Sequence, residues 1–187
     1  MNLLEMKKKV LGMIEELNPD SALLTDDPDI ATKINEVTNQ IMFELARMKK
    51  IPKYVELEVN EGDVIEFADI EKKCGYEIYQ VSLIAGVDYA PKANGTVFKM
   101  LEGGTAEIDC FVYPERIGEK TKDKAYEFEL TADCLEIMPY GIAADLLKSD
   151  VSAEYGNIYA TRYESMLQRL DPRYQMNSIW VEGGVSV

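Results

Sequence analysis

Two groups of closely spaced carboxylates are the side chains in this sequence whose type and spacing could do chemistry. The first group, Asp26, Asp27 and Asp29, offers the oxygen ligands that calcium prefers. It lacks the central glycine and the distal glutamate of an EF-hand loop, and Pro28 is typical of the first turn of a helix. We therefore expect Asp26 or Asp27 to cap a helix, and we expect no metal site.

The second group, Glu61, Asp63, Glu66 and Asp69, could supply the paired carboxylates of a glycosidase. No histidine occurs in the 187 residues, so the commonest general base, proton shuttle and metal ligand is missing. The group has no base, nucleophile or metal companion. We therefore predict no catalytic, cofactor-binding or metal-binding residues, and a protein that is not an enzyme.

The three cysteines, Cys74, Cys110 and Cys134, lie far apart and form no CxxC pair. This spacing argues against a disulfide framework or a zinc site and favours reduced, buried thiols. We expect a cytosolic protein, because the N-terminal residues do not form a signal peptide and no stretch approaches the roughly 20 apolar residues of a membrane span.

The charge balance restricts the class of partner. With 20 basic and 34 acidic residues, the chain has a net charge of −14. Such a surface repels phosphate backbones, so sequence-specific binding of DNA or RNA is disfavoured.

Helical periodicity marks the first fifty residues. Apolar residues at three- and four-residue spacing predict a short amphipathic helix over 3–17 and a longer one over 28–50. Phe43 lies off the apolar stripe of the second helix, among polar residues. Either the following β region covers this ring or the ring meets a partner chain.

The middle of the chain changes to strand-forming sequence. Alternation and β-branched or aromatic residues predict antiparallel strands, which we place at residues 54–60, 76–84, 96–101, 105–113 and 126–130. Residues 64–72 are ambiguous and could include a short helical turn. The run Glu102-Gly103-Gly104 predicts a hairpin between the third and fourth strands.

Two further helices are predicted over 135–147 and 151–170. Because proline is tolerated in the first turn of a helix, the regular part of the first is expected to begin near Met138–Pro139. Apolar positions at helical spacing define the expected core of the pair, namely Leu135, Met138, Ile142, Leu146, Ile158, Met166 and Leu170. Tyr155, Tyr159 and Tyr163 recur every four residues and form either a core edge or an interface.

The last fifteen residues are predicted to be neither a helix nor a domain. They contain the only tryptophan, within the β-competent run Ile179-Trp180-Val181. An aromatic anchor on a flexible tail is suited to strand addition to another subunit. The predicted subunit or partner interface therefore comprises Phe43, Tyr155, Tyr159, Tyr163, Ile179, Trp180 and Val181.

These patterns predict an α+β protein. N- and C-terminal helices form a small bundle, with an inserted antiparallel β region and an extended C-terminal tail. The predicted parts are the N-terminal helices at 1–53, the β insertion at 54–130, the closing helices at 131–172 and a flexible interaction tail at 173–187.

The chain resembles the head–tail connector (adaptor) proteins of tailed bacteriophages and prophages. The resemblance spans most of residues 28–172 and is carried by packing motifs rather than catalytic ones. In the closing helices the matching residues are Leu135-Glu136, Pro139-Tyr140, Ala143, Leu146-Leu147, Asp150 and the run Tyr163-Glu164-Ser165-Met166-Leu167. In the middle segment they are Gly86-Val87-Asp88-Tyr89 and Phe111-Val112-Tyr113-Pro114.

The resemblance implies a non-enzymatic virion protein. Such a protein is made in the host bacterial cytoplasm and resides in the virion neck, at the head–tail junction. It forms a ring of about twelve subunits through heterologous contacts, docks on the portal protein and links it to tail completion proteins. Packaged DNA would pass an acidic channel wall that does not grip its phosphates. The alternative is a small β-containing protein-binding module or regulator without a virion role.

Overall fold

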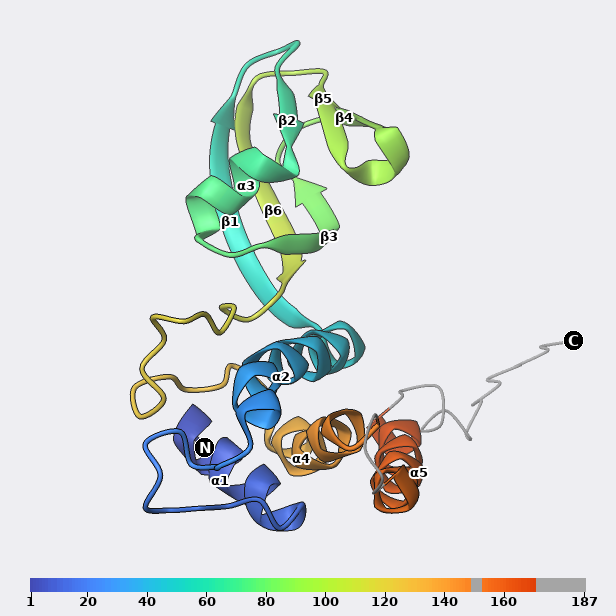
Figure 1. The fold of residues 1–187 in the computed structure, drawn as a ribbon. Coiled ribbons are helices and arrows are strands. Elements are labelled where there is room, and N and C mark those ends of the chain that lie inside the picture. Colours follow the sequence, from blue (N-terminus) through green and yellow to red (C-terminus); the bar gives the residue numbers. More distant parts are fainter. Residues whose placement is uncertain (149–152, 171–187) are drawn as a thin grey trace, which may run out of the picture.

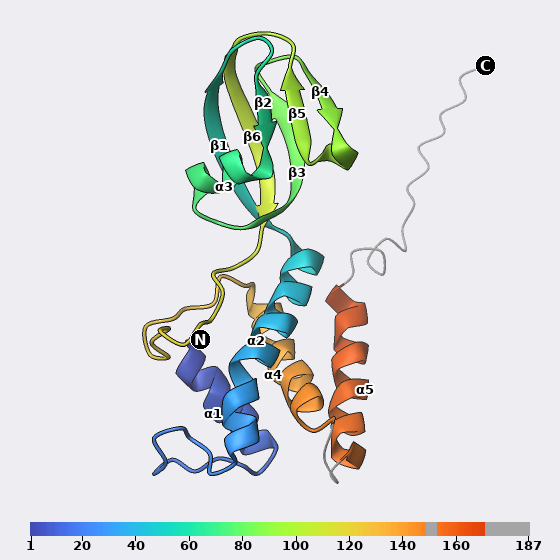
Figure 2. The same cartoon turned by 45° about the horizontal axis from the view of Figure 1, so that its top comes forward.

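The protein consists of a helical bundle and a separate β module stacked on one end of it (Figures 1 and 2). The structure is a computed structural model that describes residues 1–148 and 153–170. The bundle contains α1 (Leu3–Met13), α2 (Pro28–Lys49), α4 (Ala132–Leu146) and α5 (Ala153–Leu170). The predicted α+β class, with terminal helices around an inserted antiparallel β region, is confirmed. The predicted C-terminal tail lies outside the described residues.

The β module contains all the described strands. They are β1 (Ile51–Val59), β2 (Val64–Glu66), β3 (Ile78–Ala85), β4 (Tyr89–Lys92), β5 (Val97–Met100) and β6 (Gly104–Val112). A short helix, α3 (Phe67–Cys74), follows β2, and a 3₁₀ turn, η1 (Ala93–Gly95), follows β4. The ambiguous stretch at 64–72 thus forms a short strand followed by the first turns of α3.

The strands form two three-stranded antiparallel sheets, with the orders β1-β6-β3 and β2-β5-β4. The hairpin predicted between β5 and β6 is therefore wrong, because these neighbours in sequence lie in different sheets. Backbone hydrogen bonds joining Met100 to Gly62 and Asp63 keep the end of β5 beside β2. Phe98 and Met100 on β5 are buried between the sheets, and this burial favours the observed pairing.

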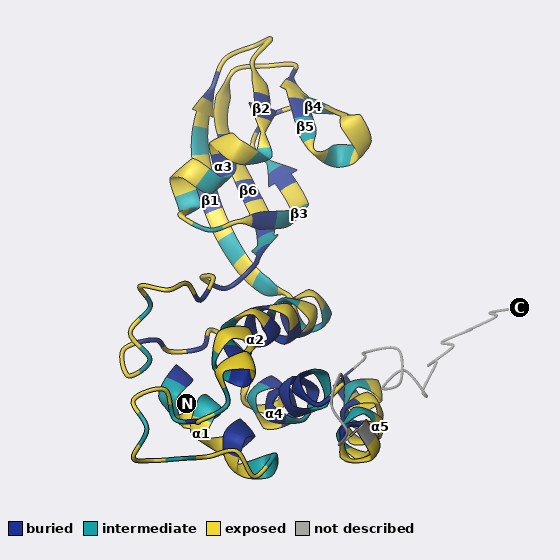
Figure 3. Cartoon of the chain, in the orientation of Figure 1, coloured by how far each residue is buried: buried dark blue, intermediate teal, exposed yellow. Residues whose placement is uncertain are grey.

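Each module has its own hydrophobic core (Figure 3). The bundle core contains side chains from all four bundle helices, whereas the β core contains side chains of both sheets and Ile70 of α3. The two modules meet at a junction cluster, which we define as Phe43, Arg47, Tyr79, Phe111, Tyr113 and Arg116.

The junction cluster fixes the β module on the end of α2. The Tyr113 ring lies 4.8 Å from the Phe43 ring and 4.9 Å from the Tyr79 ring, centroid to centroid. The Tyr79 hydroxyl donates to the Ala46 carbonyl at 3.0 Å, and the Arg47 Nε donates to the Tyr113 hydroxyl. These contacts combine aromatic packing with hydrogen bonds and cation–π attraction.

Two helix boundaries differ from the prediction. α1 ends at Met13 rather than at residue 17, because Ile14 caps it and Glu15 takes a left-handed backbone conformation with φ +61°. α4 begins at Ala132, so Pro139 lies within the helix and not in its first turn. The Pro139 side chain is buried, and packing outweighs the intrinsic preference of proline for helix starts.

The segment that returns from the β module to α4, residues 113–131, belongs to the helical bundle. The strand predicted at 126–130 is wrong, since this stretch makes only an isolated bridge between Glu127 and Asn2. Ile117, Tyr126 and Phe128 instead insert their side chains into the bundle core. The β insertion therefore ends at Val112 rather than at residue 130.

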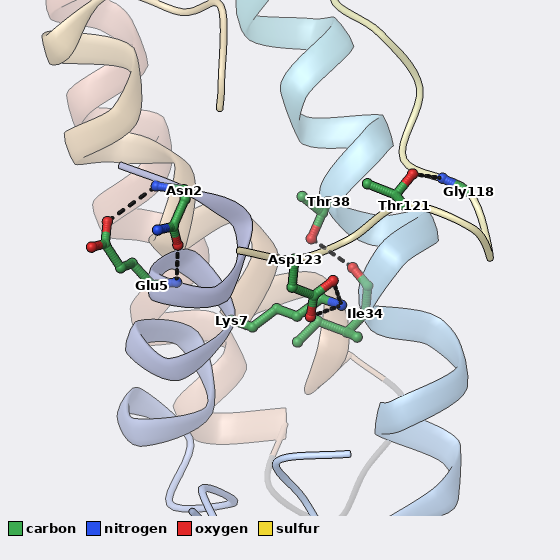
Figure 4. Close-up of polar contacts among 8 residues, drawn as sticks. All are labelled: Asn2, Glu5, Lys7, Ile34, Thr38, Gly118, Thr121 and Asp123. Atoms are coloured by element: carbon green, nitrogen blue, oxygen red, sulfur yellow. Dashed lines mark hydrogen bonds and ion pairs between the residues drawn. The ribbon is translucent and has the colours of Figure 1, made fainter. Parts of the chain in front are cut away.

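The return segment is tied to α1 by polar contacts (Figure 4). The Lys7 ammonium pairs with the Asp123 carboxylate at 2.8 Å, and the Leu4 amide donates to the Asp123 carbonyl at 3.1 Å. In the same region, Asn2 and Glu5 form a capping box at the start of α1.

A buried asparagine ties the return segment to α2. The Asn39 side-chain amide donates to the Ile117 carbonyl at 2.9 Å, and the Ile117 amide donates to the Asn39 Oδ1 at 2.8 Å. Both residues are buried. One side chain thus satisfies both backbone groups of a residue that belongs to no helix or strand.

We expect Asn39→Ala to lower the free energy of unfolding by about 2–4 kcal/mol, because it leaves two buried backbone groups unsatisfied. Urea denaturation followed by circular dichroism would measure the loss. Asn35→Ala, one turn earlier on α2, is the matched control, because the Asn35 Oδ1 is buried and has no hydrogen-bond partner in the described residues. It should change stability by less than about 0.5 kcal/mol or raise it. Equal losses in the two variants would contradict this role of Asn39.

Candidate interaction surfaces

The contact between α4 and α5 depends on glycine at two positions. A Cβ at Gly141 on α4 would lie 2.8 Å from the Tyr163 Cε2 and 3.1 Å from the Ile41 Cδ1. A Cβ at Gly156 on α5 would lie 3.2 Å from the Leu147 Cβ. The missing side chains allow the Tyr163 ring and the α5 backbone to approach α4 closely.

Tyr163 is a buried member of this helix pair. Its side chain is part of the bundle core, and its hydroxyl donates to the Glu44 Oε2 on α2 at 2.8 Å. Burial, together with this hydrogen bond, raises the pKa of the Tyr163 phenol well above its ordinary value. Tyr163 therefore joins α5 to α2 within one chain and does not belong to a free interaction surface.

The outer face of α5 carries exposed apolar side chains that no other described element covers. Tyr155 is 65% exposed and Ile158 is 62% exposed. Ile158 was predicted to lie in the core, and this prediction is wrong, because the side of α5 that faces α4 is narrower than its apolar stripe. Figure 3 shows α5 exposed over much of its surface, whereas α4 beside it is largely buried.

A shallow groove of about 690 Å³ lies between α5 and Glu136 of α4, with Ile158 in its wall. Ile158 and Met166 supply apolar walls, Arg162 and Arg169 supply positive charge, and Glu136 supplies one negative charge. The Arg162 guanidinium also lies 4.7 Å from the centre of the Tyr140 ring. We call the surface formed by Tyr155, Ile158 and Met166 the α5 strip.

The remaining predicted residues are placed as follows. Met138, Ile142, Leu146 and Leu170 are buried as predicted, and Leu135 and Met166 are half-buried against the bundle core. Tyr159 is half-buried, and its hydroxyl donates to the Met13 carbonyl on α1. Phe43 packs within the chain, in the junction cluster. Ile179, Trp180 and Val181 lie outside the described residues.

The β module presents an acidic sheet face that the sequence analysis did not identify. Exposed side chains of β1 and β6 form cross-strand rows, with Tyr54 opposite Asp109 and Glu56 opposite Glu107. A like-charged pair in this arrangement is destabilising. A hydrogen bond to Glu56, the main cause, raises the pKa of Tyr54 to about 12. The alternating acids of β1 are visible in the sequence, but the opposing acids are known only from the register.

Three of the carboxylates first considered for chemistry accept hydrogen bonds from nearby backbone amides. Asp27 is the N-cap of α2, and its Oδ1 accepts the Asp29 amide at 2.8 Å. Asp63 accepts the Asn60 amide at 2.8 Å, and Asp69 accepts the Glu66 amide at 2.9 Å. Across residues 1–148 and 153–170, no three cysteine or carboxylate side chains are grouped so that they could hold a metal ion.

The three cysteine thiols differ in burial. Cys110 and Cys134 are buried, and burial raises the pKa of Cys110 to about 11, whereas Cys74 at the end of α3 is half-buried.

None of the described helices is long and apolar enough to cross a membrane.

Comparison with known proteins identifies no family for the chain. No protein-family model and no curated protein matches it.

We expect Gly141→Ala to lower the free energy of unfolding by about 1–2 kcal/mol, because overpacking against Tyr163 and Ile41 outweighs the gain in helix propensity. Gly12→Ala is the control, because Gly12 lies in α1 with no atom within 4 Å of a built Cβ. That variant should keep or raise stability, by up to about 1 kcal/mol. Thermal denaturation of both variants would test the prediction, and a neutral Gly141→Ala would contradict it.

Tyr163 should make stability fall at alkaline pH. Because its folded-state pKa is raised, the unfolded chain releases the phenol proton near pH 10 while the folded chain keeps it. The contribution of the raised Tyr163 pKa to the free energy of unfolding is therefore complete below pH 10. It is lost as the pH rises toward the pKa of Tyr163 in the folded state. Between about pH 10 and 12 the parent should lose about 1.4 kcal/mol per pH unit more than Tyr163→Phe.

Urea denaturation at a series of pH values would measure this difference. At pH 7, Tyr163→Phe should be less stable by about 1–2 kcal/mol, because it loses the hydrogen bond to Glu44. The two stability curves should then converge above pH 10 and cross by about pH 12. Parallel curves across this range would show that the phenol is not buried as described.

Proposed function

We propose that this protein is a non-enzymatic head–tail connector of a tailed phage or prophage. It docks on the portal protein and links the portal to tail completion proteins. In this proposal the chain assembles into a closed ring, in which one face of each subunit contacts a different face of the next. The kind of assembly in this proposal comes from the sequence resemblance. The surfaces described above are the candidates for the contacts within it.

The observation that carries this proposal is the uncovered α5 strip. Tyr155 and Ile158 are exposed on the last described helix of the bundle, and Ile158 also lines a groove with apolar and charged walls. Burying two such side chains in an interface would contribute about 1.5–3 kcal/mol each. An exposed apolar strip with a polar surround is typical of a surface that meets another protein.

The charge distribution also supports the proposal. The acidic sheet face and the net charge of −14 disfavour a hold on DNA phosphates. A channel wall of this sign would let the genome slide past. Within this proposal, the acidic sheet face is the candidate for the lumen side of the ring.

The test pairs the full chain with the portal protein encoded in the same genome. Negative-stain electron microscopy of the mixture should show rings of the chain stacked on portal rings. The double variant Tyr155→Ser, Ile158→Ser should fold normally, because both side chains are exposed, yet its affinity for the assembly should fall by roughly 100-fold or more. Mass photometry would measure that change.

Leu23→Ser is the matched control, because Leu23 is an equally exposed apolar residue (67%) in the loop between α1 and α2. It should assemble like the parent. Full assembly of the double variant would contradict the role of the α5 strip. A chain that binds one partner in a 1:1 complex and never forms rings, or a genome without portal and tail genes nearby, would favour the binding-module alternative.

A further inference from the structure

Within residues 1–148 and 153–170, β1 is an edge strand whose outer side has no partner strand. It pairs with β6 on one side only, over all nine of its residues. Among the described residues, no backbone hydrogen bond outside the sheet ladder involves residues 51–59. A long edge with free amides and carbonyls is a template for one more strand.

A groove lies along this edge. Five consecutive residues of β1, 54–58, form one wall, and Lys73 and Cys74 at the end of α3 form the other. Its volume is about 580 Å³. A groove between an edge strand and a helix is the geometry in which an extended peptide adds to a sheet, with its side chains alternating between the groove and solvent.

We propose that this groove receives the C-terminal segment of a second copy of the chain, which adds to β1 as a strand through its residues 178–182. This inference rests on the proposed ring and names the acceptor for its subunit contact. The run Ser178-Ile179-Trp180-Val181 has the composition of a strand, and Trp180 supplies an aromatic anchor.

The positions of the two elements favour a second copy over the chain's own tail. The tail follows Leu170, at the end of α5. In both Figure 1 and Figure 2, α5 lies on one flank of the molecule, whereas β1 forms the opposite edge of its sheet. A contact from one flank to the opposite flank of the next copy is heterologous, and repetition of such a contact closes a ring.

The length of the segment is sufficient for this contact. The ten residues from Leu170 to Trp180 span up to roughly 33–36 Å when extended. Residues 171–187 also outnumber the nine residues of β1, so a full strand can be added with residues left as a connection. Cys74 provides a native reporter inside the groove, because it is half-buried while Cys110 and Cys134 are buried.

The experiment is a disulfide scan between two full-length chains. The donor carries Cys74→Ser and, one at a time, Ser178→Cys, Ile179→Cys, Trp180→Cys, Val181→Cys or Glu182→Cys. The acceptor is the parent chain. After mild oxidation with diamide, donor–acceptor dimers on a non-reducing gel should appear at alternate tail positions, because strand side chains alternate in direction. An acceptor with Cys74→Ser is the matched control and should give no donor–acceptor dimer, so that only tail–tail disulfides between two donors remain.

A second measurement does not depend on cysteine. Hydrogen exchange should show that amides of residues 51–59 gain protection on oligomerisation. In the full chain, Trp180→Ala should abolish that gain and weaken self-association by roughly 30-fold or more.

The outcomes separate this inference from the proposed function. Rings without cross-links, and without protection of β1, would overturn the strand addition and leave the connector proposal intact. Cross-links and protection in open chains that never close on a portal would support the strand addition and contradict the connector. Cross-links confined to one polypeptide, seen when a tail cysteine is combined with native Cys74, would show that the tail folds back on its own chain and would overturn the inference.

Discussion

Two hydrogen bonds between Asn39 and the backbone of Ile117 fix the course of the return segment, residues 113–131. The rest of the structure depends on that course. The return segment has no helix or strand and only local turns, and these turns leave both backbone groups of the buried Ile117 without a partner from the segment. Asn39 on α2 satisfies both groups. With that anchor in place, Tyr126 and Phe128 enter the core and α4 begins at Ala132, against α2. The position of α5 then follows from its contact with α4.

The division into two cores determines how a force passes from one module to the other. The chain passes between the modules twice, from α2 into β1 and from β6 into the return segment. At both crossings the junction cluster adds aromatic and hydrogen-bonding contacts, through Tyr79 and Tyr113. A force applied to the β module is therefore transmitted to α2 through packed rings as well as through the backbone. This arrangement suits a protein that connects two larger bodies, as the proposed function requires.

The fold class could be predicted from the sequence because periodicity is local. α2 has an apolar stripe over six turns and an aspartate cap, and both signals are present in the residues that form the helix. Strand pairing is not local. β5 pairs with β2, whose residues lie more than thirty positions earlier, and the glycines beside it resembled a hairpin signal. Helix start signals also failed at Pro139, where burial in the core outweighs local preference.

The candidate surfaces could be predicted only in part. The exposure of Tyr155 agrees with the predicted interface, but Tyr163 is buried and Ile158 is exposed, against their predicted places. A broad apolar helix face does not reveal which side its neighbour occupies. The glycine contact at Gly141 decides this, since it draws the Tyr163 side toward α4 and turns Ile158 outward. The β1 groove had no sequence signal, because it requires α3 to lie beside a strand edge.

The bundle is made from both ends of the chain, and this imposes an order on folding during synthesis. α1 and α2 leave the ribosome with uncovered apolar faces, and the side chains that cover them begin at Ile117. At about 5–20 residues per second, this wait lasts roughly 3–14 s. The strands of the β module all lie between residues 51 and 112, and β6, the central strand of one sheet, ends five residues before Ile117. The β module is therefore complete in sequence just before that cover begins. We therefore expect nascent chains released before α4 to contain a folded β module above an open helical half that chaperones bind.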